Sequence, residues 1–114
     1  MTQAGDGLTI TTADTDEAHV IAVGGELDLA SAPELSRALA APGGAEDAPV
    51  RLDLSAVTFI DSSALRALLL AGRQLAERGR TLQIGPRSDV VSRVLEVTQL
   101  DQQTEAFHVL PDPS

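Results

Sequence analysis

The strongest constraint on the fold of this chain is a strand pattern, a helix pattern and a second strand pattern that follow one another in its middle. Residues 50–54 (VRLDL) alternate apolar and polar side chains, as a half-buried strand does. Apolar residues then recur at helical spacing for three turns, and residues 78–80 (RGR) end this helix with basic side chains and a glycine. Residues 81–84 (TLQI) predict another strand, so the run is typical of a parallel β-α-β unit. The apolar face of the helix consists of Leu65, Leu68, Leu69, Gly72, Leu75 and Ala76.

Two strand patterns and a helix precede this unit. Residues 8–12 and 19–23 predict a hairpin, and Gly24-Gly25 is expected to end its second strand. Ser31, with Glu34 three residues later, predicts a capping box at the start of a helix. The buried stripe of this helix is Leu35, Ala38 and Leu39.

A shorter helix and a strand follow the central unit. Ser88 or Asp89 starts the helix, and residues 106–110 predict the last strand. The order β-β-α-β-α-β-α-β predicts an α/β fold in which helices back one mixed sheet. We expect a single domain over residues 1–114, with its core at about residues 8–110. The inward-facing residues of the shorter helix are Val90, Val91, Val94 and Leu95.

Composition and charge argue against two classes of partner. The 114 residues include 17 acidic and 8 basic side chains, which gives a formal charge of −9 and repels nucleic-acid phosphates and anionic lipid surfaces. Two phenylalanines are the only aromatic residues, so the chain has too few aromatic side chains to stack on nucleic-acid bases. We expect no nucleic-acid partner, and a protein partner with a basic face is more plausible.

The residues that are absent restrict location and chemistry. The chain has no cysteine, which excludes disulfides, thiolate metal sites and thiol catalysis. Its start lacks the basic and apolar segments of a secretory signal. The longest apolar run, residues 67–71, is far shorter than the ~20 residues that cross a bilayer. We therefore expect a cytoplasmic protein without membrane insertion.

The junction between the central strand and its helix carries the first candidate site, Asp61-Ser62-Ser63. Asp61 or Ser62 can cap the helix by accepting bonds from its unpaired backbone N–H groups. A helix N-terminus also favours an added anion, and a phosphate on Ser62 would bring about −1.5 to −2 charges. The junction therefore fits a structural cap, a modified serine or both.

Acidic side chains of the Gly24-Gly25 segment form the second candidate. If the sheet is parallel as predicted, Glu26, Asp28 and Asp61 follow the carboxyl ends of neighbouring strands, where functional crevices of open α/β sheets lie. These carboxylates fit loop solvation, partner binding or a hard metal ion. They have no metal-ligand spacing, so we expect no metal.

The outer face of the central helix is the third candidate, and catalytic machinery is not evident. Leu70 falls opposite the buried stripe, near Arg66 and Arg73, which favours a docking surface. Ser62 lacks the G-x-S-x-G motif of serine hydrolases, and no Walker-type phosphate loop occurs. Both histidines fall in predicted strands rather than beside a nucleophile. We expect no independent enzyme activity and no cofactor.

Two motifs together resemble the STAS domain, and in particular the bacterial anti-sigma factor antagonists. They are residues 25–35 (GELDLASAPEL) and residues 52–65 (LDLSAVTFIDSSAL). The similarity continues through residues 80–84 (RTLQI) and 91–100 (VSRVLEVTQL), so it covers nearly the whole chain. The resemblance implies a β-sheet flanked by helices on one side.

The resemblance also implies a phosphorylation switch. In such antagonists the serine directly after the aspartate, here Ser62, accepts phosphate from a serine kinase that is also the anti-sigma factor and uses ATP. A serine phosphatase reverses the reaction. The dephosphorylated antagonist binds the anti-sigma factor and frees the sigma factor for transcription. Asp28 matches a family position in the binding region, and Ser63 matches the hydroxyl beside the phosphoacceptor. Asp61 and Ser63 can then serve the helix cap, which leaves Ser62 as the hydroxyl that we expect to carry phosphate.

Two residues depart from the family pattern, and other roles for the domain stay open. Ala64 stands where Gly is common, which favours a firmer helix start, and Gln99 stands where Gly is common at a helix C-cap. A STAS subunit of a transport or sensor complex would use Ser62 only as a cap and Leu70 for a permanent partner. A nucleotide-binding STAS domain is a further alternative, although the chain has no phosphate loop.

Overall fold

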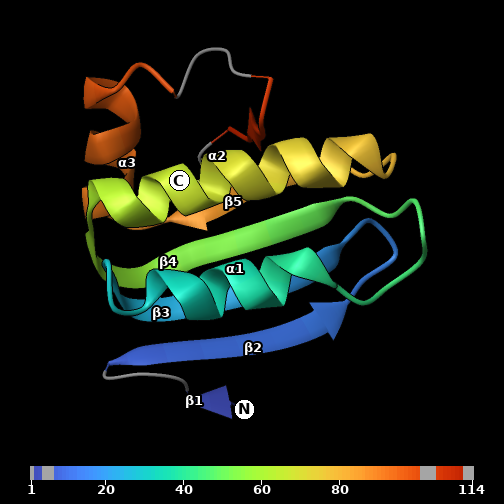
Figure 1. Cartoon of the computed structure of the whole chain (residues 1–114), viewed down its shortest axis with the longest axis horizontal. Helices are drawn as coiled ribbons and strands as arrows, with labels where there is room; N and C mark the ends of the chain where they lie inside the picture. The colour runs from blue at the N-terminus through green and yellow to red at the C-terminus, as the bar shows by residue number, and fades with distance from the viewer. Residues whose placement is uncertain (1, 4–6, 101–104, 112–114) are drawn as a thin grey trace.

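The computed structural model describes residues 2–3, 7–100 and 105–111, which form one mixed sheet with helices packed on it (Figure 1). The domain was predicted over residues 1–114, and residues 1 and 112–114 at its ends lie outside the described residues. The described strands are β1 (Thr2–Gln3), β2 (Leu8–Asp14), β3 (His19–Leu27), β4 (Val50–Ile60), β5 (Leu82–Arg87) and β6 (His108–Val109). The described helices are α1 (Ala32–Ala40), α2 (Ser62–Glu77) and α3 (Asp89–Val97).

The strands lie in the sheet in the order in which they occur along the chain. β2 is antiparallel to both β1 and β3, whereas β3, β4, β5 and β6 run parallel to one another. Each parallel connection moves one strand further in the same direction, and right-handed crossovers then place α1, α2 and α3 on one face. Figure 1 shows α1 and α2 side by side in front of the sheet, with α3 beside the first turn of α2. The predicted mixed α/β sheet flanked by helices on one side is confirmed.

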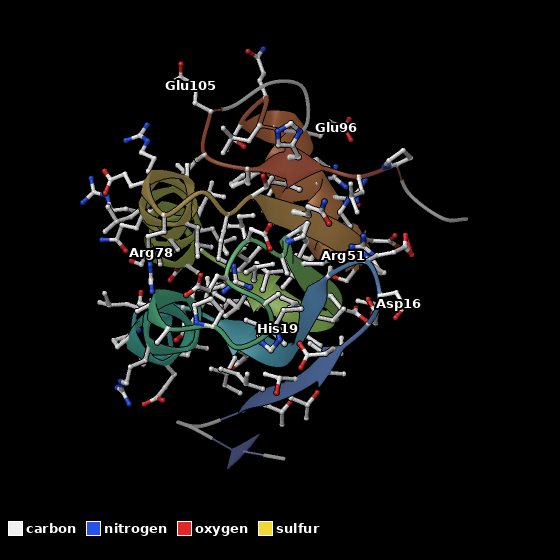
Figure 2. All side chains as sticks on the ribbon, turned by 90° about the vertical axis from the view of Figure 1, so that its right-hand side faces the viewer. Asp16, His19, Arg51, Arg78, Glu96 and Glu105 are labelled. Atoms are coloured by element: carbon white, nitrogen blue, oxygen red, sulfur yellow. The ribbon has the colours of Figure 1, made fainter. Side chains whose placement is uncertain are left out.

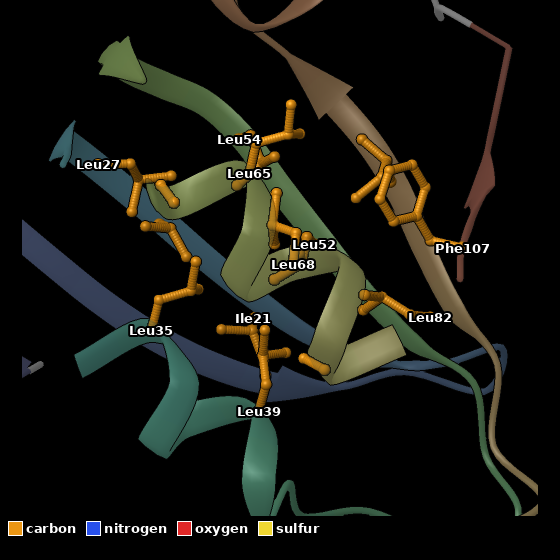
Figure 3. Packing of buried hydrophobic residues seen from close by; sticks show 14 of the residues in the cluster. Ile21, Leu27, Leu35, Leu39, Leu52, Leu54, Leu65, Leu68, Leu82 and Phe107 are labelled. Atoms are coloured by element: carbon orange, nitrogen blue, oxygen red, sulfur yellow. The ribbon is translucent and has the colours of Figure 1, made fainter. Parts of the chain in front are cut away.

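The core fills the space between this sheet face and the helices (Figure 3). Its strand side chains, such as Leu52 and Leu82, alternate with polar residues that point to the open face. Each fully buried leucine contributes roughly 1.5–3 kcal/mol relative to an exposed one, so a core made mainly of aliphatic residues is stable. Phe107 closes the core beside β5.

The predicted helical stripes are mostly confirmed. In α1, Leu35 and Leu39 are buried and Ala38 is half-buried. In α2 the prediction for Ala76 is wrong, because this residue is exposed and Ala71 is buried instead. Gly79, with a φ of 77°, ends α2 as predicted.

Strand ends differ from the sequence prediction. β3 does not stop at Gly24-Gly25 but continues to Leu27, because β4 extends to Ile60 and pairs with it through two register shifts. The last strand is His108–Val109 rather than residues 106–110, and β1 lacked a recognisable pattern. The extension of β3 and β4 has a consequence for function, because Leu27 and Ile60 end side by side.

Candidate functional site

Three segments that are distant in sequence meet at the carboxyl edge of the parallel strands. The β3–α1 loop begins after Leu27, α2 begins after Ile60 and Asp61, and α3 begins after β5. Because β3, β4 and β5 are neighbours, these segments follow one another along the edge with the start of α2 in the middle. This is the edge at which open α/β sheets carry their functional crevices.

Asp61 joins two of these segments. Its Oδ1 accepts a hydrogen bond from the Ala64 backbone N–H at 3.1 Å, which caps α2 as predicted. Its Oδ2 accepts a bond from the Leu29 backbone N–H, also at 3.1 Å. One carboxylate therefore fixes both the first turn of α2 and the β3–α1 loop. Ala64, one of the two residues that depart from the family pattern, is fully buried in that turn.

The capping box predicted at Ser31 is wrong. Ser31 has helical backbone angles, and its side chain makes no capping bond with α1. Its buried hydroxyl donates to the Glu26 carbonyl at 2.7 Å and accepts from the Asp28 N–H at 2.9 Å. Ser31 bonds to the preceding loop instead, as serine readily does with nearby backbone groups. It thereby fixes the conformation of the β3–α1 loop.

The two serines at the start of α2 have different environments. Ser62 is exposed and Ser63 is half-buried, and neither hydroxyl has a hydrogen-bond partner among the described residues. The prediction that Ser63 shares the capping role is therefore wrong, because Asp61 alone caps the helix. The Ser62 hydroxyl is accessible and has no structural bond to lose.

The acidic side chains at the end of β3 and in the β3–α1 loop do not converge on a cation, and Glu26 lies within β3 rather than after it. Asp28 Oδ1 accepts the Ser31 N–H at 3.0 Å, and Glu26 points to solvent. Within residues 2–3, 7–100 and 105–111, no three histidine or carboxylate side chains form a group that could hold a metal ion. The Asp28 carboxylate accepts a backbone N–H, and both residues add negative charge at the sheet edge where α2 begins.

The outer face of α2 is as the sequence predicts. Arg66, Leu70 and Arg73 are exposed, and the Leu70 side chain keeps 55% of its surface. At 100° per residue these three positions and Ser62 fall within about 80° of the helix circumference. Leu70 lies about 12 Å along the axis from Ser62. The face that carries Ser62 therefore continues into a basic strip with one apolar side chain.

A groove beside Ser62 has no counterpart in the sequence prediction. It has a volume of about 370 Å³ and lies between the start of α2 and α3. Val97, 75% exposed, stands on one wall, and Leu29, 74% exposed, lies on the other side of Asp61. The signal for Leu29 in the sequence was an apolar residue directly after Asp28. The exposure of Val97, in contrast, depends on the rotation of α3 about its own axis. The lining residues are Ile60, Asp61, Ser62, Leu65, Arg93, Val94, Val97 and Thr98.

The histidines lie at the opposite end of the sheet. His19 begins β3, roughly 25 Å along the strand from its carboxyl end, and its Nδ1 contacts Asp14 Oδ1 at 2.6 Å. Figure 2 faces that end and shows His19 near the middle of the view. His108 pairs with Gln83 near the start of β5. Neither imidazole can activate the Ser62 hydroxyl.

Fold and site together define a small α/β domain that presents a capped helix start, an accessible serine and exposed apolar side chains at one sheet edge. A family model described as "Mlab, STAS domain" matches residues 10–111. The chain belongs to the STAS domain family, as its sequence motifs predicted. None of the helices in the described part of the chain is long and apolar enough to span a membrane.

The relatives are anti-sigma factor antagonists. RsfB, the anti-sigma-F factor antagonist of Mycobacterium tuberculosis strain H37Rv, is 31% identical over 111 residues, which cover 96% of this chain and 88% of that protein. The anti-sigma-B factor antagonist of Listeria monocytogenes is 32% identical over 96 residues, which cover 84% of this chain and 83% of that protein. A crystal structure of an anti-sigma factor antagonist from Mycobacterium paratuberculosis has a TM-score of 0.76 and 29% identity, covering 98% of this chain and 92% of that chain.

Proposed function

We propose that this protein is an anti-sigma factor antagonist that a serine kinase switches off by phosphorylating Ser62. The unphosphorylated form binds an anti-sigma factor that is also this kinase, and the sigma factor is thereby released. A serine phosphatase restores the binding form. Because sigma factors act in bacterial transcription, the proposal places the protein in the cytoplasm.

The observation that carries the proposal is the state of the Ser62 hydroxyl. It is exposed at the start of α2 and has no hydrogen-bond partner in the described part of the chain, while Asp61 already caps the helix. In phosphoryl transfer its Oγ would attack the γ-phosphorus of ATP, ADP would leave, and the hydroxyl proton would pass to a base of the kinase. Ser63, half-buried, is less accessible to a kinase.

The surroundings of Ser62 make phosphorylation an effective switch. Exposed Leu29, Leu70 and Val97 provide apolar contacts near the serine, and such side chains commonly carry much of an interface's binding energy. A phosphate adds about −1.5 to −2 charges at that surface, next to Asp61. A loss of only ~1.4 kcal/mol weakens binding tenfold, so modest desolvation and repulsion suffice.

The charge of the protein supports binding as its mode of action. The net charge of −9 favours encounter with a basic partner surface. With both histidines at the far end of the sheet, the proposed role of Ser62 is that of a phosphate acceptor, and the kinase supplies the catalysis. The proposed neighbours of the phosphorylation site or contacts of the partner are Glu26, Asp28, Asp61, Ser63, Arg66, Leu70 and Arg73.

Intact-mass measurement after incubation with serine kinases from the same source, ATP and Mg²⁺ tests the proposal. The wild type should gain one phosphate, the Ser62→Ala variant should gain none, and Ser63→Ala, the matched control, should be labelled like the wild type. Equal labelling of the wild type and Ser62→Ala, or no labelling by any kinase, would contradict phosphorylation at Ser62. Ser62→Asp should weaken capture of the kinase partner about tenfold or more.

The exposed Leu70 favours one second candidate, a STAS subunit of a transport or sensor complex that binds its partner permanently. In this role Leu70 and its flanking arginines would hold the partner, and Ser62 would be only a residue of the first helical turn. Leu70→Asp would then abolish assembly while Ser62→Asp would leave it unchanged. The opposite ranking of these two variants distinguishes the switched antagonist.

A further inference from the structure

We propose that Arg93 on α3 binds the phosphate of phosphorylated Ser62 across the groove, and that this contact ties α3 to the start of α2. The inference rests on the proposed phosphorylation of Ser62. It concerns how the modified protein holds its phosphate, which is a separate matter from which kinase adds it.

The groove brings the two residues together from different elements. Ser62 and Arg93 both line the cavity of about 370 Å³, and the other walls are mainly apolar. Ser62 is the first residue of α2, and Arg93 lies near the middle of α3. Figure 1 shows α3 beside the first turn of α2. An arginine side chain is long and flexible enough to turn its guanidinium along such a groove toward an added phosphate.

The charges in the groove also favour this contact. Asp61 and Arg93 are its only charged lining residues. Both carboxylate oxygens of Asp61 already accept backbone N–H bonds, from Ala64 and from Leu29, so the carboxylate is held toward the backbone. Arg93 is exposed, and the ion pairs found among the described residues, His19 with Asp14 and Arg37 with Glu34, do not involve it. Its guanidinium is therefore available.

The start of α2 provides the second half of the phosphate site. The backbone N–H groups of Ser62 and Ser63 have no hydrogen-bond partner within the described part of the chain. α2 has 16 residues, and the N-terminus of such a helix favours an anion. A guanidinium matches phosphate geometry with two parallel hydrogen bonds, which lysine cannot provide. The phosphate would lie between these N–H groups and Arg93, over the apolar walls of the groove.

Phosphoserine incorporated at position 62 during translation allows a test that needs no kinase. The second pKa of the phosphate, about 6 for an isolated group, is followed by ³¹P NMR at low ionic strength in the full chain. Removal of a contacting positive charge raises this pKa, because the dianion loses its partner. We expect Arg93→Gln to raise it by about 0.5, since an exposed pair of this kind changes a pKa by about 0.15–0.7 unit.

Two arginines of α2 provide matched controls, and Arg93→Lys shows whether the guanidinium is needed. Arg73→Gln removes the same charge from an exposed position three turns along α2 and should change the phosphate pKa by less than about 0.2. Arg93→Lys should give a value between those of the wild type and Arg93→Gln.

Equal rises for Arg93→Gln and Arg73→Gln would overturn the inference. So would a larger rise for Arg66→Gln, one turn from Ser62, because the phosphate would then be held within α2. Failure of kinases to label Ser62 would contradict the proposed function and leave this result unaffected.

Discussion

Asp61 is the residue on which the local structure of the site depends most. Its two carboxylate oxygens bond to backbone N–H groups from different loops, at Ala64 and at Leu29, both at 3.1 Å. Ser62, the next residue, makes no side-chain bond in the described part of the chain. Neighbouring residues therefore divide two tasks, since Asp61 stabilises the junction and Ser62 leaves its hydroxyl accessible.

This division predicts that two neighbouring substitutions differ in their effect on stability. Asp61→Ala removes an N-cap and the bond to Leu29, and should lower the free energy of unfolding by about 1–2 kcal/mol. Ser62→Ala removes no hydrogen bond and should stay within about 0.5 kcal/mol of the wild type. Thermal unfolding followed by circular dichroism measures both. A Ser62→Ala variant that loses as much stability as Asp61→Ala would show that the hydroxyl has a structural role.

At this scale, sequence reasoning succeeded where chemistry is local and failed where it depends on distant pairing. Asp61 as a cap follows from its place before a helix, and the exposed Leu70 follows from helical periodicity. The bond from Asp61 to Leu29 depends on the register of β3 against β4, which no local pattern specifies. Ser31 has the residue type and spacing of a cap, yet its hydroxyl bonds to the preceding loop, since serine can satisfy either set of backbone groups.

At the scale of elements, α2 and α3 end in the same way with different residues. In α2 the Arg80 N–H bonds to the Leu75 carbonyl and the Gly79 N–H to the Ala76 carbonyl. In α3 the Leu100 N–H bonds to the Leu95 carbonyl and the Gln99 N–H to that of residue 96. Both are Schellman motifs, which place one residue in the left-handed region. That residue is Gly79 in α2, with a φ of 77°, but Gln99 in α3, with a φ of 62°.

These two helix ends predict that exchanging glycine and glutamine at the left-handed position changes stability in opposite directions. A residue with a side chain is strained in the left-handed region by about 1 kcal/mol, so Gln99→Gly should raise the free energy of unfolding by about 0.5–1 kcal/mol. Gly79→Gln should lower it by about 1 kcal/mol, because a Cβ there meets no atom within 4 Å and only the backbone strain remains. Urea unfolding measures both. A Gln99→Gly variant less stable than the wild type would show that the glutamine side chain stabilises the helix end.

The elements themselves were more predictable than their ends. Periodicity indicated α1, α2 and α3 because each must bury one apolar stripe against the sheet. The predicted end of β3 was wrong. A pair of glycines ends a strand only when no partner strand continues beside it, and β4 continues to Ile60. Strand length is thus decided by the pairing partner, which is remote in the sequence.

At the scale of the whole molecule, α2 is the element that holds the layers together. It packs beside α1, covers the sheet, borders the groove with α3 and contacts the segment before β6. The last of these contacts leaves no room for a side chain at one position of α2. Gly72 faces Ala106 so closely that an added Cβ would stand 1.8 Å from the Ala106 carbonyl oxygen. The sequence placed Gly72 on the buried face, but a glycine does not reveal which segment approaches it.

Gly72→Ala tests this approach, because local and tertiary effects have opposite signs. Alanine favours a helix over glycine by about 1 kcal/mol, so an unconstrained position would gain stability. Here the methyl group forces α2 away from the Ala106 backbone, and we expect a loss of about 2–4 kcal/mol in the free energy of unfolding, measured with urea. Gln74→Ala, on the exposed face of the same helix, is the matched control and should change stability by less than about 0.5 kcal/mol. If Gly72→Ala were as stable as the wild type, the segment before β6 would not pack against α2 at this distance. The glycine would then serve only the local geometry of the helix.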